Sequence, residues 1–183
     1  MVELIIGGLI ATVTVIVVLL IFYYYNRIRI LYNRIEEAWA QIDVQLKKRY
    51  DLVPNLVETV KGYAKHEKEI FEKVAQARQG MVTGTREERM ESSNQLTSTL
   101  KSLFAVAENY PVLKASENFK LLQEQLEGIE NKIAYARQYY NSSVLNYNNI
   151  ITTIPGTWFA GNRTKHAFLE VPEEERSPIK VKF

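Results

Sequence analysis

Hydrophobic residues recur every three or four positions along most of the chain, and this spacing predicts an almost entirely helical protein. From residue 28 onward the steps alternate between four and three, as in a helix that packs along partner helices in a coiled-coil-like manner. One seven-residue series comprises Ile28, Ile35, Ile42, Arg49, Leu56, Tyr63, Ile70 and Ala77. The second comprises Tyr32, Trp39, Leu46, Val53, Val60, Glu67 and Val74.

Pro54 lies inside this repeat and is a candidate helix break, because proline lacks the N–H donor of a helical residue. The phase of the repeat is nevertheless the same on both sides of it. We therefore favour one continuous, kinked helix over 27–79. The alternative is a short break, since Asp51 could cap a helix that restarts at Pro54.

The remaining helix ends carry clear signals. Gly80 and Gly84 mark a turn, and Thr85 followed by Glu88 predicts a capping box that opens a helix to about residue 109. Pro111 is a second predicted helix break, because the hydrophobic phase changes there. A last helix is expected over about 116–150, with an inward face of Phe119, Leu122, Leu126, Ile129, Ile133, Ala136, Tyr140, Ser143, Tyr147 and Ile150.

An uncharged run begins at Leu4 and ends at Phe22. As a helix it spans ~28 Å at about 1.5 Å per residue, close to the hydrocarbon thickness of a bilayer. Three tyrosines of the kind found at membrane–water interfaces follow the run, at positions 23, 24 and 25. The first arginines come next. These predicted interface residues are Tyr23, Tyr24, Tyr25, Arg27 and Arg29. This order predicts an uncleaved single-pass anchor, since a signal peptide would carry basic residues before the run and small residues after it.

All 23 Lys and Arg residues follow the apolar run. The positive-inside bias therefore predicts a cell (inner) membrane protein whose C-terminal domain is cytoplasmic, and the extracytoplasmic side is the alternative.

The predicted fold class is all-α. A transmembrane anchor (1–26) continues without a flexible hinge into an elongated antiparallel bundle of three to four helices (27–151). An irregular tail (152–183) then packs on the bundle. Its aromatic residues Trp158, Phe159 and Phe168 are expected to cap one end of the bundle, with contact to the membrane surface as the alternative, and its last five residues could form a short strand.

Two charged residues occupy otherwise apolar series, Arg49 and Glu67. Charged side chains are seldom buried without a partner. One interpretation places both at the edge of the packed face, with their charged ends in water. The other is a partnered polar site that fixes how the helices align.

A Tyr-Asn pair recurs seven residues apart, as Tyr140-Asn141 and Tyr147-Asn148. Seven residues return to nearly the same helix face. Core packing, with hydrogen bonds to a neighbouring helix, is the first interpretation. A contact strip for another subunit or a partner helix is the second.

The sequence offers little for catalysis. It has no Cys and two His, and His66-Glu67 begins an H-E-x-x-H pattern in which Ile70 replaces the second histidine. We therefore expect no catalytic residue, no metal site and no cofactor, and hence no enzyme. A net charge of +2 is also too small to predict binding to nucleic acid.

The stretch "RYDLVPNLVETVKGYAKHE" at 49–67 resembles the LemA family. The resemblance continues in "ENYPVLKASENFKLLQEQLEGIENKIAYAR" at 108–137 and "YNSSVLNYNNIITTIP" at 140–155. It implies a prokaryotic, membrane-anchored helical bundle without an established enzymatic activity, some of whose relatives take part in magnetosome formation. It also implies a four-helix bundle with a turn near Pro54.

From these features we expect a non-enzymatic scaffold that associates with copies of itself and shapes or organises the bilayer. The alternative is an adaptor that presents a helical face to another membrane protein, such as a protease or a sensor. Apolar side chains left uncovered on the bundle would favour self-association.

Overall fold

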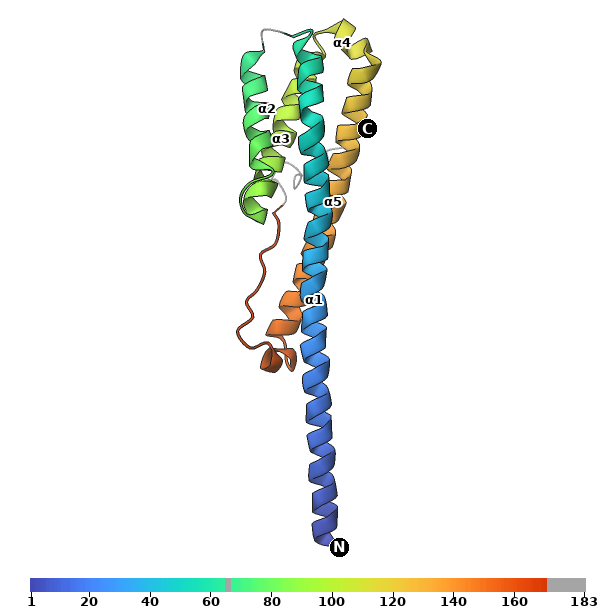
Figure 1. Ribbon diagram of the computed structural model, residues 1–183, viewed down its shortest axis with the longest axis vertical. Coiled ribbons are helices and arrows are strands. Elements are labelled where there is room, and N and C mark those ends of the chain that lie inside the picture. The colour runs from blue at the N-terminus through green and yellow to red at the C-terminus, as the bar shows by residue number, and fades with distance from the viewer. Residues whose placement is uncertain (65–66, 171–183) are drawn as a thin grey trace, which may run out of the picture. The chain divides into compact units, whose positions relative to one another are not determined.

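The computed structural model describes residues 1–64 and 67–170 (Figure 1). These residues form helices and connecting turns, without a strand, so the all-α fold class is confirmed. The predicted strand at the last five residues lies outside the described residues. The elements are α1 (Val2–Lys61), α2 (Lys68–Gly80), α3 (Arg86–Ala107), α4 (Pro111–Ala115), α5 (Glu117–Thr152) and a 3-10 helix, η1 (Gly156–Phe159).

Helix α1 contains, in one uninterrupted helix, the apolar run and both seven-residue series as far as Val60. Its N-terminal portion has the length and composition to cross a membrane, and its side chains are uncovered by the rest of the chain. The predicted boundary at residue 26 coincides with no end of a helix, and as a domain boundary it stays a prediction.

The predicted helix break at Pro54 does not occur, because α1 passes through Pro54 and ends at Lys61. The favoured continuous helix over 27–79 is therefore confirmed through Pro54 and wrong beyond Lys61, and the turn that the family resemblance implied near Pro54 is not found there. The chain turns just after Lys61, where Gly62 follows. Tyr63, expected to face inward, is consequently 45% exposed.

The other predicted ends are confirmed. Gly84 adopts a positive φ of 97° in the turn after α2. The Thr85 side chain caps α3 by accepting a hydrogen bond from the Glu88 backbone N–H, while the Glu88 carboxylate accepts from the Thr85 N–H. Pro111 opens α4, where its missing N–H costs no helical hydrogen bond.

The chain divides into two compact units, which we describe separately. The first comprises Met1–Trp39 and Tyr139–Phe168. In it, α1 and the end of α5 run antiparallel, because Trp39 packs edge-on to Tyr140 and Tyr32 to Tyr147. Its core also includes Ile28, Leu31, Ile35, Val144 and Ile151.

The second unit begins at Ala40 and contains the last part of α1, all of α2, α3 and α4, and the first part of α5. These elements form a helical bundle (Figure 1). Its core repeats the predicted inward faces, with Ile42, Leu46, Val53, Leu56, Val60, Leu96, Leu100, Leu103, Phe119, Leu126 and Ile133 all buried.

Candidate functional site

The carbonyl group left without a partner by Pro54 is satisfied by an arginine of α2. In a helix, the N–H of residue 54 would donate to the carbonyl of residue 50, and proline has no N–H. The Tyr50 carbonyl instead accepts a hydrogen bond of 2.9 Å from Nε of Arg78. The Arg78 guanidinium also lies over the Tyr50 ring, 3.7 Å from its centroid. Arg78 thus allows α1 to remain helical through Pro54 and ties α2 to it.

Arg49 lies inside the second unit, 2% exposed, and is surrounded by polar partners. One terminal nitrogen donates to the backbone and hydroxyl oxygens of Ser93, at 3.2 and 2.9 Å, and the other donates to the Thr97 hydroxyl at 3.0 Å. Glu130 of α5 lies 2.8 Å from the guanidinium and also accepts from Thr97. This Arg49 cluster joins α1, α3 and α5.

Burial lowers the pKa of the Arg49 guanidinium, and the negative charge of Glu130 opposes that shift. An arginine remains protonated even so, so the cluster holds a buried positive charge. Glu67 is not part of it. That residue stands half-buried at the start of α2, and its side chain makes no capping hydrogen bond.

A third arginine fixes the start of α3. Nε of Arg89 donates to the Met81 carbonyl at 2.8 Å, and its guanidinium forms an ion pair with Asp43 of α1. Arginines at positions 49, 78 and 89 therefore connect α1 to every long helix of the second unit. Sequence reasoning singled out only the first of these, because the other two do not interrupt an apolar series.

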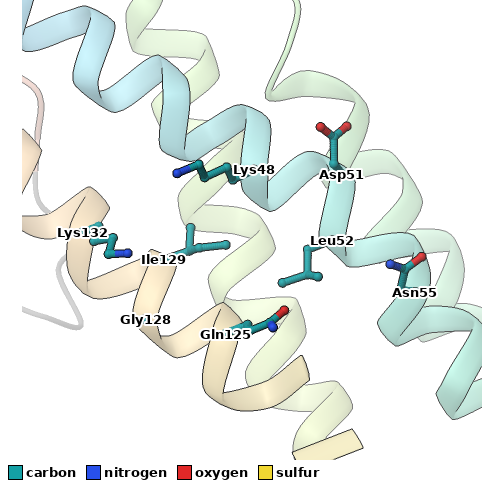
Figure 2. A pocket seen from close by; sticks show the side chains of 8 residues that line it. All are labelled: Lys48, Asp51, Leu52, Asn55, Gln125, Gly128, Ile129 and Lys132. Atoms are coloured by element: carbon teal, nitrogen blue, oxygen red, sulfur yellow. The ribbon is translucent and has the colours of Figure 1, made fainter. Parts of the chain in front are cut away.

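An open groove of about 570 Å³ lies between α1 and α5 in the second unit (Figure 2). Leu52 of α1 and Ile129 of α5 are its apolar lining residues. Gly128 also lines the groove, and a Cβ added to it would meet no atom within 4 Å, so the space beside it is open. Its polar lining is Lys48, Asp51, Asn55, Gln125 and Lys132.

The α5 side of this groove continues into an exposed face that we call the α5 outer strip. Its members follow one another at steps of four and three: Leu121, Gln125, Gly128, Lys132 and Tyr135. Leu121 is 53% exposed and Tyr135 is 73% exposed. Steps of four and three place side chains on one face of a helix, so these five residues share a face of α5 that is distinct from its buried one.

In the first unit, the repeated Tyr-Asn pair packs inward. Tyr140 and Tyr147 are buried, and Asn141 is half-buried. Asn148 donates to the backbone carbonyl of His166 at 2.9 Å and accepts from its N–H at 2.9 Å. The amide therefore binds the tail, where we had expected a neighbouring helix. Tyr140, Tyr147 and Asn148 are thus buried within the chain, as the core-packing interpretation expects, and the contact with another subunit stays a prediction.

Tyr147 also makes an edge-on contact with the His166 ring, and burial raises the pKa of its phenol.

The predicted membrane-interface residues of α1 are mostly exposed. Leu4, Phe22, Tyr23 and Tyr25 have large uncovered side chains, and the side chains of Arg27 and Arg29 are exposed next to them. Tyr24 is half-buried, because Phe159 of η1 stacks on its ring with centroids 5.2 Å apart. The tail aromatics therefore do not form the cap that was expected on the bundle: Phe159 packs on a residue of the predicted anchor, and Trp158 and Phe168 are exposed.

Among the described residues, no three His, Cys, Asp or Glu side chains gather in a way that could hold a metal ion. His66, which begins the partial zinc pattern, lies outside the described residues. The Arg49 cluster consists of hydrogen bonds and an ion pair, and the groove is lined by apolar and polar side chains. This arrangement can hold helices together and can bind another surface.

Two comparisons identify similar proteins. A family model described as the LemA family matches residues 38–183. The chain is also 23% identical over 162 residues to the magnetosome protein MamQ of Magnetospirillum gryphiswaldense. That similarity covers 74% of this chain and 60% of the relative, so the relative extends well beyond the matched region.

Proposed function

The chain belongs to the LemA family, and from that premise we propose that it is a membrane-anchored helical scaffold that associates with copies of itself. Its family and its relative are membrane-associated, and α1 begins with an apolar run long enough to span a bilayer. We place the bundle on the cytoplasmic side of the cell (inner) membrane, because the Lys and Arg residues follow that run.

The observation that carries the proposal is the α5 outer strip. Leu121 and Tyr135 expose large side chains two helical turns to either side of Gly128. A glycine between two apolar residues lets a second helix approach closely. Single exposed apolar residues are common on protein surfaces, but Leu121 and Tyr135 share one helix face, lie on either side of a glycine and stand beside an open groove, which suits the packing of a second helix.

A second copy of the chain is the occupant we assign to this strip. Confinement to a membrane raises the local concentration of anchored copies, which favours their association. The groove lining also carries charges that a partner helix could contact: Lys48 and Lys132, and Asp51, whose carboxylate forms an ion pair with Lys47. Repeated contacts of this kind would organise a patch of bilayer.

The mass of the full-length protein in mild detergent tests the proposal, measured by light scattering across a concentration series. We expect a defined assembly for the natural sequence. The double variant Leu121→Glu/Tyr135→Glu should dissociate it, because two carboxylates would then have to be buried in the contact.

The matched control carries the same two charges outside the strip. Val82 and Val112 are exposed apolar residues of the same unit, and Val82→Glu/Val112→Glu should keep the natural mass. A monomer for the natural sequence at every concentration would contradict self-association and would favour the adaptor function, in which another membrane protein occupies the groove.

A further inference from the structure

Two large apolar side chains of the tail are left uncovered next to the end of the apolar run. Ile154, just after α5, is 73% exposed, and Trp158 of η1 is 71% exposed. An exposed tryptophan is unusual, because its indole ring is among the largest apolar surfaces a protein can bury. These residues belong to the first unit, together with the end of the run.

Contacts with two consecutive tyrosines fix the height of this segment along α1. The Phe159 ring stacks on Tyr24 with an interplanar angle of 9°. The Arg163 guanidinium lies 5.6 Å from the centroid of the Tyr25 ring. Tyr24 is two residues beyond the last residue of the apolar run, or ~3 Å of helix rise. Segment 154–159 is therefore held at the level where α1 changes from apolar to polar.

The surroundings have the composition of a membrane-water interface. A cleft of about 320 Å³ is lined by Tyr23, Arg27, Ile154 and the end of α5. Aromatic rings and arginines are enriched at this depth, where the apolar part of the side chain meets acyl chains and the polar part meets phosphate groups.

We propose that segment 154–159 is a second membrane contact, in which Ile154 and Trp158 insert between the lipid headgroups and the upper acyl chains of the bilayer that α1 spans. The bilayer is the occupant to expect, because the segment is continuous with the apolar run through Tyr24. The segment would hold the first unit against the surface and restrict the tilt of α1 within it. The inference rests on the membrane-anchored part of the proposed function.

Trp158 itself reports the contact. The chain has two tryptophans, so Trp39→Phe leaves Trp158 as the sole indole fluorophore. The full-length variant is reconstituted into phosphatidylcholine/phosphatidylglycerol vesicles, with and without lipids brominated at the upper part of the acyl chain. We expect a blue-shifted emission that the brominated lipid quenches strongly.

The matched control is Trp158→Phe, which leaves Trp39 alone. Trp39 packs edge-on to Tyr140, and we expect little quenching of it by the same lipid. If Trp39→Phe does not fold, the difference between the natural protein and Trp158→Phe gives the same quantity.

Two results would overturn the inference. Emission typical of an indole in water, quenched by iodide and not by the brominated lipid, would leave Trp158 in solvent. A blue-shifted emission that neither agent quenches would mean that protein covers it. Flotation of the vesicles with the protein tests the anchor separately, so a protein that floats without Trp158 quenching refutes only the second contact.

Discussion

Arg78 replaces the hydrogen bond that Pro54 cannot donate to the Tyr50 carbonyl, and the continuity of α1 depends on this contact. Without a donor for the Tyr50 carbonyl, a half-buried acceptor would remain without a hydrogen bond, which typically costs about 1–3 kcal/mol. Arg78 supplies the donor from a neighbouring helix. The same bond that repairs one helix therefore joins it to another.

Replacing Arg78 with methionine should lower the free energy of unfolding by about 1–2 kcal/mol. The loss should be smaller when Pro54→Ala is also present, because alanine restores the N–H that the Tyr50 carbonyl needs. Chemical unfolding of the four proteins in detergent, followed by circular dichroism, gives the coupling energy.

The control for this cycle is Lys68→Met, an exposed position on the same helix, which should cost the same with and without Pro54. A cost of Arg78→Met that is equal in both backgrounds would contradict the compensation.

The two members of the buried ion pair should not be equally sensitive. Glu130 has a 32% exposed side chain, so it can turn toward water when Arg49 is removed, whereas Arg49 cannot reach water when Glu130 is removed. We expect Glu130→Leu to cost about 3 kcal/mol, because it leaves a buried charge uncompensated. Arg49→Met should lower the free energy of unfolding by less than Glu130→Leu does. Thermal unfolding of both variants checks the order, and the reverse order would place the charge of Arg49 in solvent.

The raised pKa of Tyr147 leads us to predict that the folded state loses stability at alkaline pH. Its folded pKa is raised above the ordinary value of about 10. The folded state therefore holds this proton more tightly than the unfolded state, and stability is unaffected below about pH 10 and falls as pH rises toward the folded pKa. Tyr147→Phe keeps the ring and removes the hydroxyl group. Its melting temperature should match the natural protein at neutral pH and exceed it at alkaline pH; equal values throughout would contradict the shift.

At the scale of elements, two helical glycines should respond in opposite ways to the same change. A Cβ on Gly80 would come within 2.9 Å of the Ser92 Cβ, so α2 and α3 would have to separate. Gly80→Ala should cost about 1–3 kcal/mol. At Gly128 a Cβ meets nothing within 4 Å, and Gly128→Ala should raise stability by up to about 1 kcal/mol through helix propensity. Unfolding curves of both variants test these two opposite changes in stability, and the mass of each variant is measured in parallel so that a change in assembly is not mistaken for one in stability.

Most elements could be predicted from sequence because their signals are local. The capping box at Thr85, the proline at 111 and the inward face of α5 each depend on residues a few positions apart. The end of α1 could not be predicted, because the hydrophobic repeat keeps its phase past Lys61. The contact that replaces the missing hydrogen bond at Pro54 could not be predicted either, because Arg78 is distant in sequence. The α5 outer strip was missed for a related reason: its spacing contains Gln125 and Lys132, which reads as a solvated face until the groove beside it is seen.

At the scale of the whole molecule, the chain carries an apolar run long enough to span a bilayer and an exposed strip on α5, to which we assign a second copy. Each feature has a limited meaning alone. Under the proposed function, the first would confine the protein to a membrane and the second would offer a helix face to neighbouring copies. The absence of Cys from the sequence makes this arrangement unusually easy to test, since any cysteine introduced is the sole thiol.

Disulfide cross-linking in liposomes, at a high ratio of lipid to protein, tests self-association through α5 most directly. Single cysteines are placed in the full-length chain by Gln125→Cys, Gly128→Cys or Lys132→Cys, and Ser98→Cys, exposed on α3, is the matched control. We predict that mild oxidation gives covalent dimers from one or more strip positions and none above background from the control. Equal cross-linking at all four positions, or none at the strip, would contradict the account.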